Sequence, residues 1–483
     1  MDQSRAPLWE ALWDHARQKR ASLHIPGHRG GSGLPAELVS LTGSQVFGLD
    51  LTELPGLDDL HSPKGVIAAS CVLAARAFGA DTSFFLVNGT TCGLQALVMA
   101  AAAGGKELLI PRNAHRSVLG GLVMAGADPA YFVPEIVEPF GIDAGFSPKG
   151  VERALAENPR TGAVLVVRPN YYGVAADLES TAGFLRKRGL PVMVDEAHGA
   201  HFHFHPQLPK SAMAAGAAAC VQSVHKVGGS LGQSSLLHLR GGSIGEEEVA
   251  RALCLLQTTS PSYLLMASLD LARRQLALSG EKILDRVLSL SSELRSSLTG
   301  VRGLEVLEPG HLPPGAELDP TRVTVCVRKL GLTGYQVKSL LAERYRVFVE
   351  MADTQNIVAV VSLGTKREDT AALVSALRDI AAREKGKVKG APAAGRLLPP
   401  PFVKRLPPRR AWFMPWEAVE LDAARGRVSA ETVAVYPPGI PAVYPGEEIT
   451  PEVYEYLKEV AGMGLHCQGP SDPALKTIRV VVE

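Results

Sequence analysis

The sequence is organised around the apolar run Pro191-Val192-Met193-Val194, which ends in Asp195-Glu196-Ala197-His198-Gly199. Further along the chain comes a second polar stretch, Ser223-Val224-His225-Lys226-Val227-Gly228-Gly229. A short, continuous, β-branched run bounded by polar residues and glycine predicts a strand that is buried on both faces. Its acidic residues then lie at its carboxyl end, where open α/β sheets bind their ligands.

These two stretches contain the groups that pyridoxal phosphate (PLP) chemistry requires. The lysine forms a Schiff base with the cofactor, and the carboxylate keeps the pyridine nitrogen protonated so that the ring can accept electrons. Lys226 could instead be a surface lysine, and Asp195 a helix cap. The neighbouring Ser223 and His225, together with the glycines after Lys226, favour the catalytic interpretation.

The chain before this stretch alternates between apolar runs and helical patterns. We expect strands at 84–87, 108–110, 130–133, 163–167 and 192–194, with a helix in the segment that follows each of the first four. This alternation predicts an α/β fold with a mostly parallel sheet covered on both faces. The polar motifs follow the strand ends, so the active site is expected at that edge.

The rest of the chain is expected to form an arm and smaller domains. We predict an N-terminal arm at 1–65, a PLP-binding large domain at 66–300 and a small α/β domain at 301–385. The Pro-, Gly- and basic-rich stretch 386–410 reads as a linker, and 411–483 as a compact C-terminal domain.

Composition excludes several classes of partner. The chain of 483 residues has a formal net charge of +1, which gives no case for a nucleic-acid partner. No apolar run approaches the ~18 residues of a membrane span, and the N-terminus lacks the apolar core of a secretory signal. The six cysteines are far apart in the sequence and read as reduced thiols of a cytoplasmic protein.

Four longer strings identify a resemblance that covers nearly the whole chain. They are HIPGHRGG (24–31), VDEAHGAHFHFH (194–205), SVHKVGGSLGQSS (223–235) and YPPGIPAVYPGE (436–447). They resemble the ornithine/lysine/arginine decarboxylases, fold-type I PLP enzymes, in their short bacterial form. The resemblance implies an aminotransferase-like large domain and decarboxylation of a basic amino acid. It is strongest to the biosynthetic arginine decarboxylases, which make agmatine for polyamine synthesis.

The resemblance also assigns roles to single residues. Lys226 and Asp195 take the roles described above, and Lys226 or His225 would return a proton to Cα. Asn88-Gly89-Thr90-Thr91-Cys92-Gly93 is similar to the phosphate cup, although such a turn can also simply cap a helix. His115 would stack on the ring, or merely cap a helix. The residues expected to contact the cofactor are Thr90, Thr91, Cys92, His115, Asp195, Ala197, His198, Ser223, His225, Lys226 and, from the neighbouring subunit, Thr258.

One stretch departs from the wider pattern of fold-type I enzymes. Many of them place Asn before the Pro that follows the strand preceding the lysine, where it binds the ring hydroxyl. This chain has Arg168-Pro169-Asn170-Tyr171 instead. Arg168, Asn170 or Tyr171 could take the role, and the sequence leaves the three open.

Recognition of a basic substrate side chain calls for acidic groups. Asp58 and Asp59 in the arm, and Glu350 and Asp353 after an apolar run, are the candidates, and each pair could equally be a solvated surface acid. The series His198, His201, His203 and His205 invites a metal site, with the last three on one face if the segment is a strand. We do not expect one, because no cysteine or carboxylate completes a ligand set.

Other functions remain as alternatives. They are lysine or ornithine decarboxylation, an α-oxoamine synthase, a PLP-sensing regulator and a degenerate homologue. The string Tyr436–Glu447 favours the decarboxylases over the synthase, and no helix-turn-helix pattern supports a regulator. The resemblance implies at least a homodimer with shared active sites. Rings built through an N-terminal wing are not expected, since the sequence lacks that wing.

Overall fold

The computed structural model describes residues 1–18, 21–384, 400–435, 440–463, 465 and 467–482. They divide into two compact units that are interleaved along the chain. The first contains Met1–Ala100 and Met193–Leu284, and the second contains Ala101–Val192 and Asp285–Glu483. These interleaved units do not coincide with the contiguous domains expected from the sequence, and the bounds of those domains remain a prediction.

The first unit is built on strands β1 (Thr82–Leu86), β10 (Ser235–Leu239), β9 (Ala219–Gln222) and β8 (Val192–Asp195), in that order. β10 runs antiparallel to both β1 and β9, whereas β9 and β8 are parallel. Strands β8, β9 and β10 are buried along their whole length, as the apolar run before Asp195 predicts.

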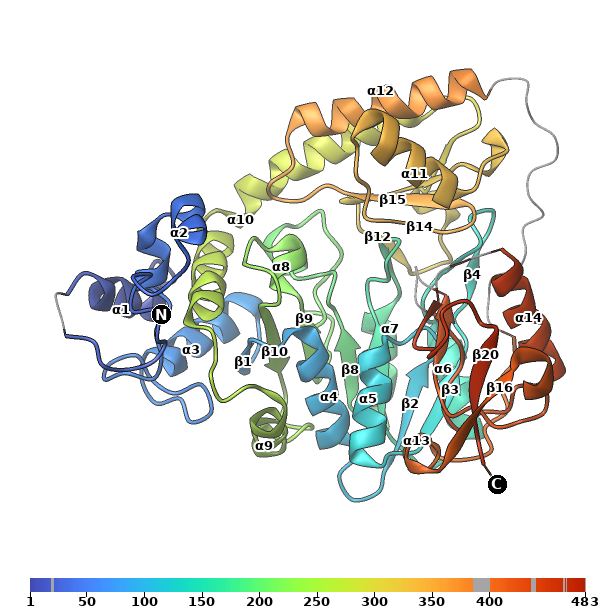
Figure 1. Ribbon diagram of the computed structural model, residues 1–483, viewed down its shortest axis with the longest axis horizontal. Coiled ribbons are helices and arrows are strands. Elements are labelled where there is room, and N and C mark those ends of the chain that lie inside the picture. The colour runs from blue at the N-terminus through green and yellow to red at the C-terminus, as the bar shows by residue number, and fades with distance from the viewer. Residues whose placement is uncertain (19–20, 385–399, 436–439, 464, 466, 483) are drawn as a thin grey trace. The chain divides into compact units, whose positions relative to one another are not determined.

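Helices surround these strands in the first unit (Figure 1). One of them, α4, begins with the predicted phosphate cup, directly after β1. Gly93 lets α4 approach the sheet, because a Cβ at this position would lie 2.7 Å from side-chain atoms of Leu86 and Val221. The helices are α1 (Pro7–Ala16), α2 (Ala36–Thr42), α3 (Val66–Phe78), α4 (Gly89–Ala101), α8 (Val224–Val227), α9 (Glu246–Leu256) and the start of α10 (Tyr263–Leu298).

A buried ion pair holds the N-terminal helix in this unit. Asp270 on α10 is fully buried and lies 2.6 Å from the guanidinium of Arg273. The same carboxylate accepts the hydroxyl of Ser70 at 3.0 Å and the backbone N–H of Leu8 at 3.1 Å. Arg273 in turn donates to the carbonyl of Arg5 at 2.6 Å. A single acid therefore caps the start of α1 and joins it to α3 and α10.

The second unit contains three parallel strands in the order β6 (Thr161–Val167), β2 (Glu107–Pro111) and β3 (Pro129–Phe132). The helix that follows each of these strands starts at a side-chain cap, which satisfies backbone N–H groups of its first turn. The caps are His115 for α5 (Arg116–Ala125), Ser147 for α6 (Pro148–Glu157) and Asp177 for α7 (Leu178–Lys187).

A four-stranded antiparallel sheet follows in the same unit. Its order is β11 (Glu305–Val306), β13 (Arg322–Cys326), β15 (Asn356–Val360) and β14 (Met351–Ala352). The helices α11 (Gly334–Tyr345) and α12 (Arg367–Arg383) pack with the end of α10 around a core that includes Leu294, Val325 and Leu377. Short strand pairs complete this region, namely β4 (Ile136–Val137) with β5 (Ile142–Asp143) and β7 (Val174–Ala175) with β12 (Glu317–Leu318).

The C-terminal region of the second unit has its own core and is anchored by one buried ion pair. Arg112, directly after β2, makes a two-pronged contact with Glu447 at 2.5 and 2.6 Å. Its guanidinium also lies 4.5 to 5.1 Å from the ring centres of Tyr131, Phe402 and Tyr444. The elements are α13 (Pro408–Phe413), β16 (Trp416–Glu420), β17 (Val433–Val435), β18 (Ile440–Val443), α14 (Pro451–Gly462), β19 (Cys467–Gln468) and β20 (Thr477–Val481).

Parts of two predicted segments fall outside the described residues. Residues 386–399 of the expected linker and Tyr436–Gly439 of the decarboxylase-like string are among them. The described part of the linker, 400–410, is bonded to its own unit. Lys404 contacts Asp128 at 2.7 Å, and Arg405 contacts Glu448.

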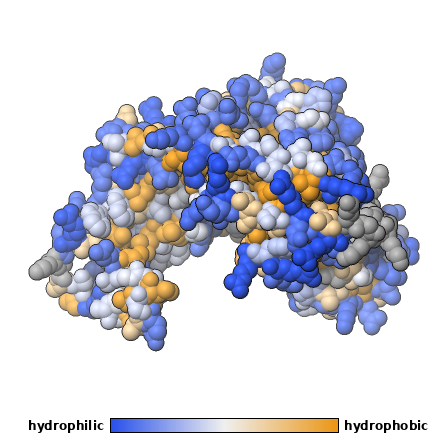
Figure 2. All heavy atoms as spheres, turned by 90° about the horizontal axis from the view of Figure 1, so that it is seen from above, coloured by the Kyte–Doolittle hydropathy of each residue, from blue (hydrophilic) through white to orange (hydrophobic). Residues whose placement is uncertain are grey.

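In the part of the chain that the structure describes, no helix is long and apolar enough to cross a membrane. On the face drawn in Figure 2, hydrophobic atoms form separate patches among hydrophilic ones. Exposed apolar side chains scattered in this way are usual for protein surfaces.

We expect Asp270→Asn to loosen the N-terminal helix. Removing one partner of a buried ion pair leaves the other charge uncompensated, at a cost of about 3–5 kcal/mol. Hydrogen exchange of the α1 amides should therefore accelerate by about a hundredfold or more. Asp14→Asn, at an exposed position of the same helix, is the control and should change little. Unchanged exchange in Asp270→Asn would show that this ion pair does not hold α1.

Candidate active site

Three hydroxyl groups meet at the start of α4 in the first unit. The Thr90 hydroxyl is in close contact with that of Ser223 and lies 3.1 Å from that of Ser235. These residues come from the N-terminus of α4, the end of β9 and the start of β10. Backbone N–H groups at a helix N-terminus and clustered hydroxyls are the donors that a phosphate group requires. The structure thus brings together Thr90 and Ser223, which the sequence predicted, with Ser235, which it did not.

The other two cup residues expected to contact the cofactor, Thr91 and Cys92, differ in their exposure. Thr91 is exposed, whereas Cys92 is buried and its thiol donates to the carbonyl of Gly89 at 3.1 Å. Burial raises the pKa of the Cys92 thiol to about 12. Cys92 therefore stays a neutral thiol that serves the local turn, and a phosphate contact from this residue would come from its backbone.

Lys226 lies on the short helix α8 and is exposed. Its Nζ is 2.9 Å from Nε2 of the buried His198. This distance lets the two groups share a proton, so a side chain predicted to lie beside the cofactor ring is in direct contact with the lysine that would bind it. A lysine amine with a neighbouring group that can take its proton is suited to Schiff-base formation.

His225 is set up as a neutral base. Its Nδ1 donates to the carbonyl of Ser234 at 2.9 Å, which leaves Nε2 as the acceptor. Burial lowers the pKa of this imidazole; the Ser234 carbonyl opposes the shift and the charge of Lys226 adds to it. An unprotonated Nε2 suits proton transfer better than donation to a phosphate.

Asp195 ends β8 and is buried. One of its carboxylate oxygens accepts the backbone N–H of Ala197 at 3.1 Å, which holds the turn after the strand. Glu196, beside it, is fully buried. Glu196 was not among the predicted site residues, although a second carboxylate directly after a buried strand is a recognisable signal.

Thr258 lies just after α9 and is exposed. Its backbone N–H donates to the Asn88 side chain at 3.2 Å, and its carbonyl oxygen is 2.9 Å from Nε2 of His61. The loop is thus tied to the residue that precedes the cup, with the Thr258 side chain at the surface. Such a position is compatible with the predicted contact to another subunit.

His115 belongs to the second unit, where it caps α5. Its Nδ1 lies 2.8 Å from the Ser117 hydroxyl and accepts the Ser117 backbone N–H at 3.3 Å. An imidazole nitrogen forms hydrogen bonds in the plane of the ring, whereas stacking uses the face, so capping and the predicted stacking on a cofactor are compatible. The two interpretations of His115 from the sequence therefore do not exclude each other.

The structure narrows the choice among Arg168, Asn170 and Tyr171. The Asn170 amide donates to the carbonyl and the carboxylate of Asp143 at 2.7 and 2.8 Å, and its oxygen accepts the N–H groups of Tyr172 and Val174. All its hydrogen-bonding capacity is used inside the second unit. Arg168 is buried, and its Nε donates to the carbonyl of Ala176 at 2.9 Å. Asn170 is therefore the least suited to bind a ring hydroxyl.

The two acids in the arm have local partners. The Asp58 carboxylate accepts backbone N–H groups of Lys64, Gly65 and Ile67 at 2.7 to 3.0 Å. Burial alone would raise the pKa of Asp58, but backbone N–H groups, those of Lys64 and Gly65 foremost, outweigh it and the pKa is lowered. Asp59 uses one oxygen for the backbone N–H of His61 at 2.7 Å. Asp58 thus has a structural role at the start of α3.

The two acids of the second unit differ from each other. Asp353 accepts the Tyr172 hydroxyl at 2.8 Å and the Asn356 amide at 2.9 Å, and burial raises its pKa. Glu350 is exposed, and no described residue forms a hydrogen bond with its carboxylate. Of this pair, Glu350 is the acid that remains available to a ligand.

The histidine series does not form a strand. Phe202–Phe204 is a short 3-10 helix, so the condition under which residues 201, 203 and 205 would share one face of a strand is not met. His203 lies 3.2 Å from the Ser211 hydroxyl, and burial lowers its pKa. Within the described residues, no three metal-binding side chains come together.

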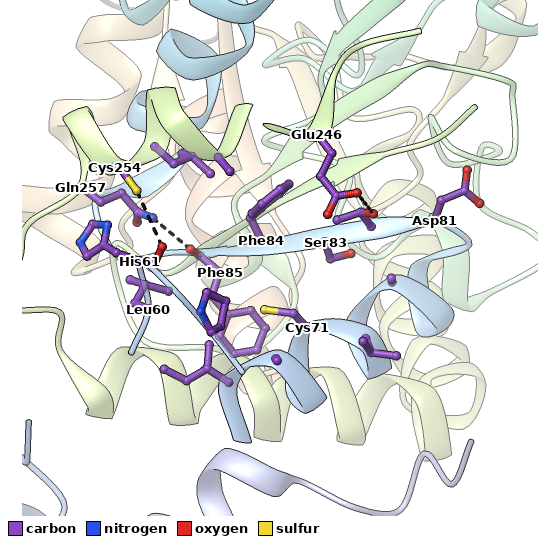
Figure 3. A pocket seen from close by; sticks show the side chains of 18 residues that line it. Leu60, His61, Cys71, Asp81, Ser83, Phe84, Phe85, Glu246, Cys254 and Gln257 are labelled. Atoms are coloured by element: carbon purple, nitrogen blue, oxygen red, sulfur yellow. Dashed lines mark hydrogen bonds between the residues drawn. The ribbon is translucent and has the colours of Figure 1, made fainter. Parts of the chain in front are cut away.

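A cavity of about 280 Å³ lies elsewhere in the first unit, between α3, β1 and α9 (Figure 3). Its wall includes Leu60, His61, Ser83, Cys254 and Gln257. None of the predicted cofactor-binding residues lines it. The chemistry is therefore assigned to the strand ends and not to this cavity.

Models of known families match most of the chain. The model described as Orn/Lys/Arg decarboxylase, major domain, matches residues 6–369. The model of the C-terminal domain of the same family matches residues 411–470.

The chain belongs to the Orn/Lys/Arg decarboxylase family.

Relatives of known description agree with this membership. An arginine decarboxylase of Bacillus subtilis is 41% identical over 100% of this chain and 99% of its own length. One from Bacillus anthracis is 39% identical over 100% of this chain and 98% of its own length. The constitutive lysine decarboxylase of Escherichia coli is 24% identical and is matched over 79% of its length.

Solved structures show the same fold. A lysine decarboxylase of Francisella novicida superposes with a TM-score of 0.86 at 21% identity, covering 99% of this chain and 81% of that chain. A structure described as SPT with PLP superposes with a TM-score of 0.53 at 15% identity, covering 67% of this chain and 78% of that chain. The predicted family, the α/β fold of this class, a decarboxylase acting on a basic amino acid and PLP as cofactor are thereby confirmed.

We expect Cys92 to resist alkylation in the native protein. A thiol reacts as its thiolate, so a pKa raised to about 12 should slow labelling at about pH 8 by roughly a thousandfold relative to an ordinary thiol. The rate should rise with pH until the pH reaches that pKa. The exposed Cys254 serves as the internal control in the same sample. Equal labelling of both cysteines, measured by peptide mass spectrometry, would contradict the buried position of Cys92.

Proposed function

We propose that this chain converts arginine to agmatine and carbon dioxide, with PLP attached through Lys226. The observation that carries the reaction is the Lys226–His198 pair, 2.9 Å apart, in the same unit as Asp195 and the Thr90–Ser223–Ser235 hydroxyls. Support for arginine comes from relatives described as arginine decarboxylases that are 38–41% identical over the full chain.

Each residue has a defined task in this proposal. PLP, when bound, supplies a sink for the electron pair left by the departing carboxylate. The buried Asp195 carboxylate would be the partner of the pyridine nitrogen and would favour its protonated form. His198 Nε2 takes and returns the proton of Lys226 Nζ. Cα would receive its proton from Lys226 Nζ, or from His225 after its Nε2, which is unprotonated at rest, has accepted one.

The phosphate is assigned to the start of α4. The Thr90 and Ser223 hydroxyls and the backbone N–H groups of Thr91 and Cys92 would hold it, with Thr258 contributed by a second subunit. Ala197 is assigned to packing against the ring, and His115 to stacking on it. Support for His115 is its place in the loop that follows β2, at the carboxyl end of a strand.

Further parts of the proposal concern the assembly and its setting. We infer a homodimer as the minimum, because the exposed Thr258 side chain would complete a site on another copy. A cytoplasmic enzyme of polyamine synthesis is consistent with the absence of disulfides among the six cysteines, all of which are free.

The test of the function is the amine produced. Purified protein reconstituted with PLP should release agmatine from arginine faster than it releases cadaverine from lysine or putrescine from ornithine. Borohydride reduction should attach the cofactor to Lys226, and Lys226→Arg should abolish both the label and turnover. Lys210→Arg, at an exposed lysine of the same unit, should change neither. A preference for lysine or ornithine would overturn the substrate, and a label elsewhere would overturn the site.

We expect Glu350→Gln to raise KM for arginine while leaving kcat for bound substrate nearly unchanged. A charge-assisted hydrogen bond typically contributes about 1.5–3 kcal/mol, which corresponds to roughly ten- to a hundredfold in kcat/KM. The matched control is Glu343→Gln on the exposed face of α11. Asp59→Asn tests the remaining acid of the arm, whereas Asp58→Asn and Asp353→Asn should lower stability because their carboxylates hold local structure. Normal KM in both Glu350→Gln and Asp59→Asn would place substrate recognition elsewhere.

A further inference from the structure

Glu196 is a fully buried acid to which the proposed reaction assigns no task. It follows Asp195 directly, and neighbouring side chains at a strand end point to opposite faces of the sheet. Its Oε1 accepts the backbone N–H of Ala212 at 2.7 Å, and its Oε2 accepts Nε2–H of Gln222 at 2.7 Å. The Cys220 thiol is a third donor. Burial, followed by the charge of Glu196 and this hydrogen bond, raises the thiol pKa well above its usual range.

Gln222 connects Glu196 to a series of buried hydrogen bonds that crosses the strands of the first unit. Oγ of Ser83 on β1 lies 2.6 Å from Nδ1 of His238 on β10. Nε2 of His238 lies 3.2 Å from Oε1 of Gln222 on β9. From Gln222 the series reaches Glu196 after β8. The Ser83 side chain, labelled in Figure 3, lies at the wall of the cavity between α3, β1 and α9.

The series has only two self-consistent directions. If Glu196 is ionised, Gln222 donates to it, so Oε1 of Gln222 accepts Nε2–H of His238 and Nδ1 accepts the Ser83 hydroxyl. If Glu196 is protonated and donates to Gln222, each hydrogen bond between Glu196 and Ser83 reverses its direction, and the His238 proton moves to Nδ1. The imidazole itself holds one proton, since burial, with a smaller contribution from His203, lowers the His238 pKa to about 3. The position of that single proton therefore reports the charge of Glu196.

We propose that Glu196 is an ionised positioning residue, toward which the successive hydrogen bonds of Ser83, His238 and Gln222 point. Its negative charge stabilises the protonated cofactor beside Asp195. The convergence of the Ala212, Gln222 and Cys220 donors on one carboxylate carries the ionised state. The second half of this inference rests on the proposed PLP site.

Two consequences follow for the strand end. The bonds to Ala212, Gln222 and Cys220 fix the backbone that carries Asp195. The buried negative charge also adds to the potential at Asp195, which raises the proton affinity of a cation held there. For carboxylates on neighbouring residues of a strand, this amounts to about one pKa unit.

The first measurement needs no cofactor. In protein labelled with 15N-histidine, the His238 signals are identified by their loss in His238→Gln. We expect a neutral imidazole with its proton on Nε2 in the wild-type protein. A proton on Nδ1 would overturn the proposal even if the protein proves to be a decarboxylase.

The decisive variant is Glu196→Gln, which keeps the shape of the side chain. The Ala212 N–H still requires an acceptor, so the new amide must turn its NH2 group toward Gln222. Gln222 then flips and donates to His238, whose proton moves to Nδ1. Glu246→Gln is the matched control, because this exposed acid binds the Thr82 hydroxyl next to Ser83. It should leave the proton on Nε2.

Ser83→Ala supplies an independent variant should Glu196→Gln fail to fold. It removes only the donor to Nδ1, so the proton should stay on Nε2. A move to Nδ1 in Ser83→Ala, or none in a folded Glu196→Gln protein, would overturn the directed series.

The last measurement tests the link to the cofactor. With PLP bound, the pKa seen in the visible absorbance of the cofactor should fall by about one unit in Glu196→Gln and stay constant in Glu246→Gln. An unchanged pKa together with an inverted His238 tautomer would overturn the electrostatic role alone. If the wild-type protein binds no PLP, the proposed function fails, while the tautomer measurement still decides the state of Glu196.

Discussion

Side chains alternate between the two faces of a β-strand, and this constraint organises the site of the first unit. At the end of β8 it separates Asp195 from Glu196, so that two adjacent acids serve different surroundings. Asp195 holds the turn to Ala197, while Glu196 gathers donors from β9 and from the loop at Ala212. Without the wholly buried strand before them, neither carboxylate would be shielded from water strongly enough to matter electrically.

The second unit uses buried charge for a different purpose. Arg112 lies between the end of β2 and Asn113-Ala114-His115, and its guanidinium is enclosed by Glu447 and the rings of Tyr131, Phe402 and Tyr444. A guanidinium can form a two-pronged bond and stack on aromatic faces at once, which a lysine ammonium cannot do. The C-terminal region is thereby joined to the segment that orients His115.

Much of this arrangement was predictable because it depends on local patterns. The apolar runs before Asp195 and Asn88 predicted the buried strands, and the strings around Lys226 predicted the family. What remained hidden depends on partners far away in sequence. Ser235 joins Thr90 only because β10 pairs with β1, and Asp58 proved structural because its carboxylate meets the start of α3. Asn170 became the least suited ring contact for the same reason, since its amide donates to Asp143, a residue distant in the sequence.

The first unit also sets the order in which the chain can acquire stability during synthesis. Its two segments are separated by residues 101–192, and the acid that caps α1 is Asp270. Until the ribosome has released that region, the N-terminal hundred residues lack both the strand that pairs with β1 and the charge that anchors their helix. At roughly 5–20 residues per second, this interval lasts on the order of ten to forty seconds. During that time the nascent chain presents an unpaired strand edge and an undocked helix, the features that make a partly folded chain prone to aggregation.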